Sequence, residues 1–113
     1  MVPDYIKEKI LENSTRLDRY GMRDLVWNKE NAEKVICSIM PDDIGILGGD
    51  VYIIENDRLR PLYDNWYCEP NEGEAKKDFF LRTKQKSLSY IMNYPVKTGE
   101  NILFSLVFTE ILD

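Results

Sequence analysis

The chain has 113 residues, with 20 acidic and 15 basic side chains, a net charge of −5 at pH 7 and no histidine. A chain of this length has room for one core, so we expect residues 1–113 to form a single domain. The lack of histidine excludes Ser–His and Cys–His nucleophile pairs, an imidazole base near neutral pH and histidine metal ligands. The acidic balance argues against nucleic-acid binding, which needs a basic patch. It is typical of a partner of basic proteins, and also of a protein whose charge serves solubility alone.

No apolar run approaches the roughly 20 residues that a membrane helix needs, and the N-terminus becomes charged within a few residues. We therefore expect a cytoplasmic protein that does not engage a membrane. Cys37 and Cys68 are expected to be reduced thiols, because the cytosol reduces disulfides. Cys37 falls within a helical pattern, and we expect it to pack as a small hydrophobic side chain.

Three helices are predicted from apolar residues that recur at helical spacing. The first covers residues 4–17 and is followed by an irregular stretch through residues 25–27. Asn28 is a favourable N-cap for the second helix, which Pro41 ends. The third and longest helix is predicted over residues 74–93.

A β-hairpin is predicted between the second and third helices. Its first strand begins at Gly45, and Asn56 and Asp57 suit a tight turn with positive φ. Residues 59–63 form a weaker return strand. Because Pro61 cannot donate a hydrogen bond, this return strand should lie at the edge of the sheet.

Residues 102–112 have the clearest strand pattern of the chain. Apolar residues on both faces predict an interior strand, covered on two sides over residues 103–108. The elements do not alternate as in a doubly wound fold. The predicted fold class is therefore α+β, with a small, mainly antiparallel sheet of the hairpin and the C-terminal strand packed against about three helices.

Two glycines followed by a carboxylate, Gly48, Gly49 and Asp50, interrupt the first strand of the hairpin. Only glycine tolerates both unusual dihedrals and the lack of side-chain volume, so the pair predicts a bulge or a close backbone approach. In this interpretation Asp50 bonds a neighbouring backbone amide. The alternative is a metal-binding or substrate-binding carboxylate. A phosphate loop is not indicated, because no Lys followed by Ser or Thr comes at the required spacing.

The return strand runs into the aromatic and polar residues Asn65, Trp66 and Tyr67. Their large rings with polar tips suit a binding hot spot, and they suit equally a core edge or a corner of the sheet. The acidic excess gathers in the same hairpin and the following loop, either as a solvated face or as the complement of a basic groove. The candidate partner-binding residues are Asp57, Asp64, Trp66, Tyr67, Glu69, Glu72 and Glu74. A basic cluster on the third helix is interpreted as a solvated face: Lys76, Lys77, Arg82, Lys84 and Lys86.

Three pieces of the sequence resemble the bacterial polymorphic-toxin immunity proteins of the family immunity protein 40. They are Ile-Leu-Gly-Gly-Asp-Val-Tyr at residues 46–52, Tyr-Asp-Asn-Trp-Tyr-Cys at residues 63–68 and Leu-Ser-Tyr-Ile at residues 88–91. The order of the predicted elements also agrees, and the resemblance extends from about Trp27 onward. It implies a non-enzymatic cytosolic protein that binds a cognate toxin domain and blocks it. No cofactor is expected, and the toxin is expected to be basic.

Motifs shared by inhibitors of different targets are expected to maintain the fold rather than to recognise one toxin. The candidate fold-motif residues are Gly48, Gly49, Asp50, Tyr52 and Asn65; Trp66 can belong with them. Two other hypotheses stay open. One is a small carboxylate-dependent or metal-dependent enzyme that uses Asp50 and Asp64, and the other is an adaptor with an unrelated partner.

Overall fold

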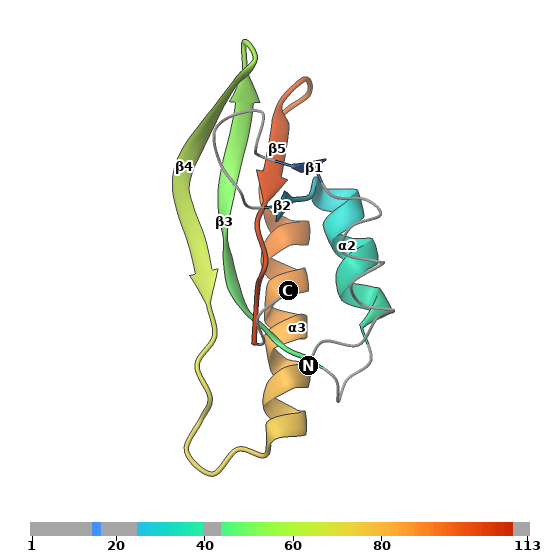
Figure 1. Cartoon of the computed structure of the whole chain (residues 1–113), viewed down its shortest axis with the longest axis vertical. Helices are drawn as coiled ribbons and strands as arrows, with labels where there is room; N and C mark the ends of the chain where they lie inside the picture. Colours follow the sequence, from blue (N-terminus) through green and yellow to red (C-terminus); the bar gives the residue numbers. More distant parts are fainter. Residues whose placement is uncertain (1–14, 17–24, 40–43, 110–113) are drawn as a thin grey trace.

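The computed structural model describes residues 15–16, 25–39 and 44–109. Within them, an antiparallel sheet packs one face against two helices, α2 (Lys29–Ser38) and α3 (Lys76–Asn93) (Figure 1). The sheet consists of β3 (Ile46–Glu55), β4 (Arg58–Tyr67), β5 (Asn101–Phe104) and β6 (Val107–Phe108). This arrangement confirms the predicted α+β class, with two described helices in place of about three.

Strand β3 is the centre of the sheet. It pairs antiparallel with β4 on one side and with β5 and β6 on the other. The hairpin turns at Asn56 and Asp57, whose φ angles of 52° and 61° confirm the predicted turn with positive φ. Strand β4 lies at the edge of the sheet, as Pro61 predicted, but it extends to Tyr67 and so is longer than expected.

The predicted single strand over residues 102–112 is wrong, because the described part of it consists of the two short strands β5 and β6. Strand β5 is covered on two sides as expected, because Leu103 and Phe104 are both buried although they point to opposite faces, whereas Val107 of β6 is 49% exposed and the expected coverage fails there. The interruption falls at Ser105 and Leu106. Ser105 takes over the pairing with β3, since its N–H donates to the carbonyl of Asp50 at 3.0 Å and its Oγ accepts from the N–H of Asp50 at 2.9 Å.

Helix α2 begins where the sequence predicts. The side chain of Asn28 accepts a hydrogen bond from the N–H of Asn31 at 2.8 Å, which caps the first turn. Cys37 lies on the exposed side of this helix, so the prediction that it packs as a hydrophobic side chain is wrong. Both cysteines are free thiols, as expected. In the described segments, no helix is long and apolar enough to cross a membrane.

The predicted helix over residues 4–17 lies outside the described residues, except at its end. There, Thr15–Arg16 form strand β1, which pairs antiparallel with β2 (Leu25–Val26). The stretch predicted to be irregular therefore contains a strand. Trp27 continues it with two backbone hydrogen bonds to Phe104, at 2.9 and 2.8 Å. Strands of two residues are too short to show a period, so the sequence pattern could not predict them.

The main core lies between the two helices and one face of the sheet. Its most buried large side chains include Trp27, Phe104 and Ile91. Lys29 at the start of α2 donates to the carbonyl of Tyr94 at 2.6 Å, beyond the end of α3. A cation is favourable at this end of a helix, where carbonyl groups lack partners. The two helices thus form one layer. We call the face of the sheet that they cover the inner face and the opposite face the outer face.

Candidate functional site

Trp66 lies on the inner face of the sheet. Its indole Nε1 donates to Ser87 Oγ of α3 at 2.9 Å, and its ring stacks on Tyr90 with 4.8 Å between the ring centroids. The side chain is 5% exposed. A ring that is packed and hydrogen-bonded within the molecule in this way offers little contact area to a partner. The structure thus favours the core interpretation of Trp66 over the hot-spot interpretation.

The residues beside Trp66 lie on the outer face, because successive side chains of a strand point to opposite faces. Gly48 is the centre of a row across this face, paired with Tyr67 on β4 and with Val107 on β6. Tyr67 is 58% exposed and Val107 is 49% exposed. Since Gly48 has no side chain, the space between these two side chains is hollow.

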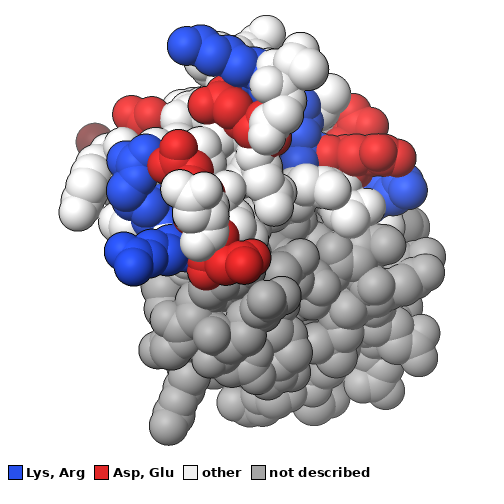
Figure 2. Space-filling view, turned by 90° about the horizontal axis from the view of Figure 1, so that it is seen from above, with Lys and Arg blue, Asp and Glu red and all other residues white. Residues whose placement is uncertain are grey.

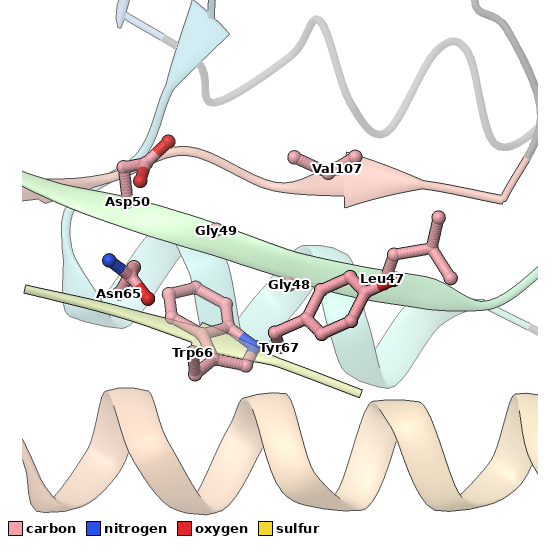
Figure 3. Close-up of a pocket in the computed structure, with 8 residues that line it drawn as sticks. All are labelled: Leu47, Gly48, Gly49, Asp50, Asn65, Trp66, Tyr67 and Val107. Carbon is pink, nitrogen blue, oxygen red and sulfur yellow. The ribbon is translucent and has the colours of Figure 1, made fainter. Parts of the chain in front are cut away.

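This hollow, which we call the Gly48 groove, has a volume of about 360 Å³ (Figure 3). Its lining comes from β3, β4 and β6: Leu47, Gly48, Gly49, Asp50, Asn65, Trp66, Tyr67 and Val107. The groove therefore gathers most of the residues of the two sequence motifs that carry the family resemblance. Leu47 and Val107 are the lining residues that the sequence pattern did not indicate as site residues.

Both glycines are required by close backbone contacts. A methyl group at Gly48 would lie 2.1 Å from the carbonyl oxygen of Trp66, and one at Gly49 would lie 2.0 Å from the carbonyl oxygen of Ser105. The pairing register also shifts on both sides of the pair, between β3 and β6 and between β3 and β4. The predicted bulge and close approach are confirmed, and the groove has a floor that no larger residue could occupy.

Asp50 stands beside the glycines, with its side chain exposed at the groove. Both of its backbone groups bond to Ser105, so the expected bond from its carboxylate to a backbone amide is replaced by backbone and serine hydroxyl contacts. Within the described segments the carboxylate makes no hydrogen bond or ion pair. None of the described residues that line the groove is a Lys or an Arg. Among the described residues of this site, Asp50 is therefore the one charged side chain, and it has no counter-charge there.

The two carboxylates of the enzyme hypothesis do not meet. Asp64 accepts a hydrogen bond from the Tyr94 hydroxyl at 2.6 Å, and the Tyr94 ring packs edge-on against Phe104 on the inner face. Burial, together with this bond, raises the pKa of Tyr94 to about 12. Asp50 lies on the outer face, across the sheet from this contact. Among the described residues, no group of three or more His, Cys, Asp or Glu side chains could hold a metal ion.

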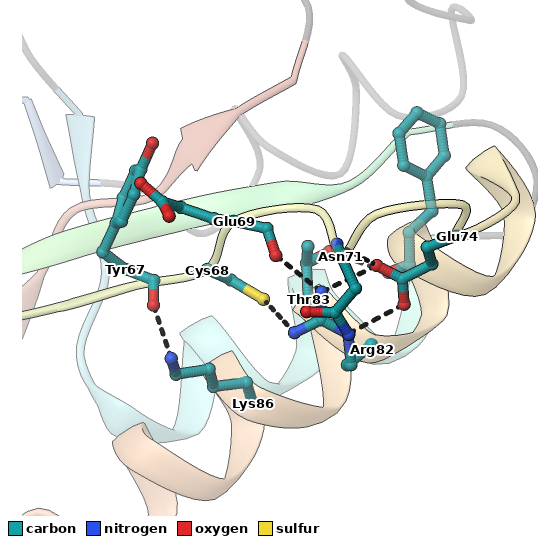
Figure 4. Close-up of polar contacts among 9 residues, drawn as sticks. Tyr67, Cys68, Glu69, Asn71, Glu74, Arg82, Thr83 and Lys86 are labelled. Atoms are coloured by element: carbon teal, nitrogen blue, oxygen red, sulfur yellow. Dashed lines mark hydrogen bonds and ion pairs between the residues drawn. The ribbon is translucent and has the colours of Figure 1, made fainter.

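The loop after β4 is fastened by Arg82 of α3 (Figure 4). Its guanidinium donates to both carboxylate oxygens of Glu74, at 2.8 and 2.9 Å, to the carbonyl of Glu69 at 2.6 Å and to Cys68 Sγ at 3.1 Å. The Glu74 carboxylate also accepts from the N–H of Asn71 at 3.0 Å. The hydrogen bonds from Arg82 and then from Asn71 lower the pKa of Glu74 to about 2. Glu74 thus holds the loop against α3, and its carboxylate is engaged within the molecule rather than by a partner.

The basic cluster of α3 is less solvated than the sequence predicts. Lys84 is 6% exposed, and Arg82 is engaged by the loop. Lys86 donates to the backbone carbonyl of Tyr67 (Figure 4). The interpretation of the whole cluster as a solvated face is therefore wrong, because part of it holds β4 and the loop against α3.

The remaining predicted partner-binding residues are spread out. Asp57 lies in the hairpin turn, at the opposite end of β4 from Tyr67, while Glu69 and Glu72 are exposed in the loop. At the hairpin end, Figure 2 shows Lys and Arg interspersed with Asp and Glu over the described surface. Arg60, for example, pairs with Glu55 at 2.7 Å. The structure therefore does not bring the predicted acids into one patch.

Tyr52, one of the candidate fold-motif residues, is 8% exposed and packs with Val26 and Leu103 in a small second core. Asn65 is exposed and pairs with Asp50 in the β3–β4 register. The candidate fold-motif residues thus divide between the core and the groove.

A family model described as Immunity protein 40 matches residues 16–108. No curated protein and no solved structure gives a match to the chain. The matched region runs from β1 to the end of β6 and so includes the core, the fastened loop and the Gly48 groove. This match agrees with the resemblance in the glycine and aromatic motifs, and the chain belongs to the Immunity protein 40 family.

Proposed function

We propose that this protein binds a cognate toxin domain of a bacterial polymorphic-toxin system and blocks it by covering its working surface. Membership in an immunity protein family supports this function over that of an adaptor with an unrelated partner. In the proposal the protein acts in the cytoplasm of the cell that makes the toxin, and it catalyses no reaction. Its net charge of −5 favours encounter with a basic toxin surface.

The outer face of the sheet around the Gly48 groove is the proposed contact surface. The observation that carries this assignment is the exposed row of Tyr67 and Val107 on either side of a residue without a side chain. Exposed apolar and aromatic groups beside a hollow are typical of interaction sites, since they are well suited to insert into and receive partner side chains. A standard interface buries about 800 Å² on each partner, so it would extend beyond the groove.

Tyr63 is the natural extension of this surface along β4. It is 86% exposed, and its φ of 62° lies in a region that a bulky side chain rarely adopts. Three residues of β4 lie opposite one residue of β3 at this point, so the strand bulges. Strained residues of this kind persist where the surrounding structure holds them, and they cluster at binding sites. An aromatic ring presented to solvent on a strained bulge fits a role in partner contact.

The test is to co-express the protein with the toxin domain encoded beside its gene, and to measure growth rescue and co-purification. We expect Tyr67→Ala to weaken toxin binding by at least about 2 kcal/mol, as for a central aromatic contact. Leu81→Ala is the matched control, because Leu81 is a half-exposed apolar residue of α3 at 43% exposure. The control should bind like the unaltered protein. Lack of any rescue or complex would overturn the function, and an unaffected Tyr67→Ala variant would overturn the assigned surface.

A further inference from the structure

The Gly48 groove has two walls and a floor, and no side chain of the described residues fills it. Tyr67 and Val107 form the two walls, and the backbone of the two glycines forms the floor. A methyl group on either glycine would collide with a backbone carbonyl oxygen. The groove is therefore a fixed feature of the sheet, and its volume of about 360 Å³ can hold an extended side chain on bare backbone.

The charge of the groove defines what fits in it. Of the described residues that line it, Asp50 alone carries a charge, and Asn65 lies directly across from Asp50 in the strand register. Two residues along a strand span about 7 Å, which separates the Asp50 carboxylate from the apolar row of Gly48. A matching occupant carries a positive head at the Asp50 end and an apolar stem between Tyr67 and Val107. An acidic occupant would be repelled, and a purely apolar one would leave the carboxylate covered and unpaired.

We propose that the Gly48 groove binds an arginine side chain of the toxin, an inference that rests on the proposed function. The arginine stem lies over Gly48 between Tyr67 and Val107, and the guanidinium pairs with the Asp50 carboxylate and the Asn65 amide oxygen. Arginine suits this site better than lysine. Its planar, weakly hydrated head can donate to two oxygen acceptors at once and can also rest against an aromatic ring.

The groove is tested first without the toxin, by NMR titration of the isotopically labelled chain with a blocked glycyl-arginyl-glycine peptide. The same peptide with citrulline is the matched control, because citrulline keeps the shape of arginine and lacks its charge. We expect millimolar binding, with a Kd of roughly 1–10 mM, that shifts the amide signals of Gly48, Gly49 and Asp50 only with the arginine peptide. Asp50→Asn should abolish the difference, while Asp78→Asn, the same change on the exposed start of α3, should preserve it.

Equal shifts with the two peptides, shifts elsewhere on the molecule, or a difference that survives Asp50→Asn would each overturn the inference. In complex with the cognate toxin domain, Asp50→Asn should raise Kd at least about tenfold, mainly through faster dissociation, and Asp78→Asn should change it less than about twofold. Tight toxin binding by Asp50→Asn would overturn the arginine inference and leave the proposed function standing. If the unaltered protein does not bind the toxin domain, the proposed function fails, and the peptide titration decides the groove by itself.

Discussion

Trp66 and Tyr67 are adjacent aromatic residues of one strand with opposite uses. Trp66 is 5% exposed, stacked on Tyr90 and hydrogen-bonded to Ser87, whereas Tyr67 is 58% exposed beside a hollow. The alternation of side chains along β4 places one ring in the core and the other on the outer face. The comparison shows that aromatic composition alone does not identify a binding residue. The side of the sheet on which the ring lies decides its role.

Removing each ring in turn tests the difference between Trp66 and Tyr67. Trp66→Ala should lower the free energy of unfolding by about 3–5 kcal/mol, because it empties part of the core and leaves Ser87 without its partner. Tyr67→Ala should lower it by less than about 0.5 kcal/mol, as is usual for exposed positions. Chemical denaturation measures both. Equal losses for the two variants would contradict the assignment of the two faces.

The glycine pair allows a second test. Gly49→Ala should lower the free energy of unfolding by about 3 kcal/mol, because the new methyl group would meet both the Ser105 carbonyl and the Trp66 ring. Gly73→Ala is the control, since nothing lies near that position and only its φ of 76° opposes a side chain. The control should cost about 1 kcal/mol. A mild effect at Gly49 would mean that the sheet can relax there and that the groove floor is not fixed.

Two acids of the loop after β4 also differ in this way: Glu74 is bound within the molecule by Arg82, whereas Glu72 is exposed. The pKa of Glu74 is lowered from 4.5 to about 2 in the folded protein, so its carboxylate stabilises the fold above pH 4.5. That stabilisation is lost as the pH falls toward 2. Glu74→Gln should therefore lower the melting temperature at pH 6, and its difference from the unaltered protein should close between pH 4.5 and 2.

Melting curves across this pH range check the prediction, with Glu72→Gln as the control. The control should melt close to the unaltered protein at every pH, because it removes an exposed group with no partner in the loop. A Glu74→Gln difference that persists unchanged at pH 2 would show that the ion pair with Arg82 is not its source.

Elements with strong local signals were predictable from the sequence. The cap at Asn28, the turn at Asn56 and Asp57 and the long helix α3 all rest on interactions between residues near in sequence. The two-residue strands β1 and β2 and the interruption at Ser105 were not predictable. They depend on pairing with distant strands, and a run of two residues carries no period. The predictions that Cys37 is packed and that Lys84 is solvated were wrong for a similar reason, since burial depends on what packs against a helix.

The features of the candidate site also separate into those that depend on residues near in sequence and those that depend on distant pairing. The α+β class, the family motifs and the need for two glycines in the hairpin were predictable from the residues alone, because they follow from local propensity and from residue types that tolerate few environments. The folded structure was needed to show that Val107 and Tyr67 flank Gly48 and that Glu74 pairs with Arg82. Strand register and ion pairing join residues far apart in the chain, and residue spacing does not record which of them will meet.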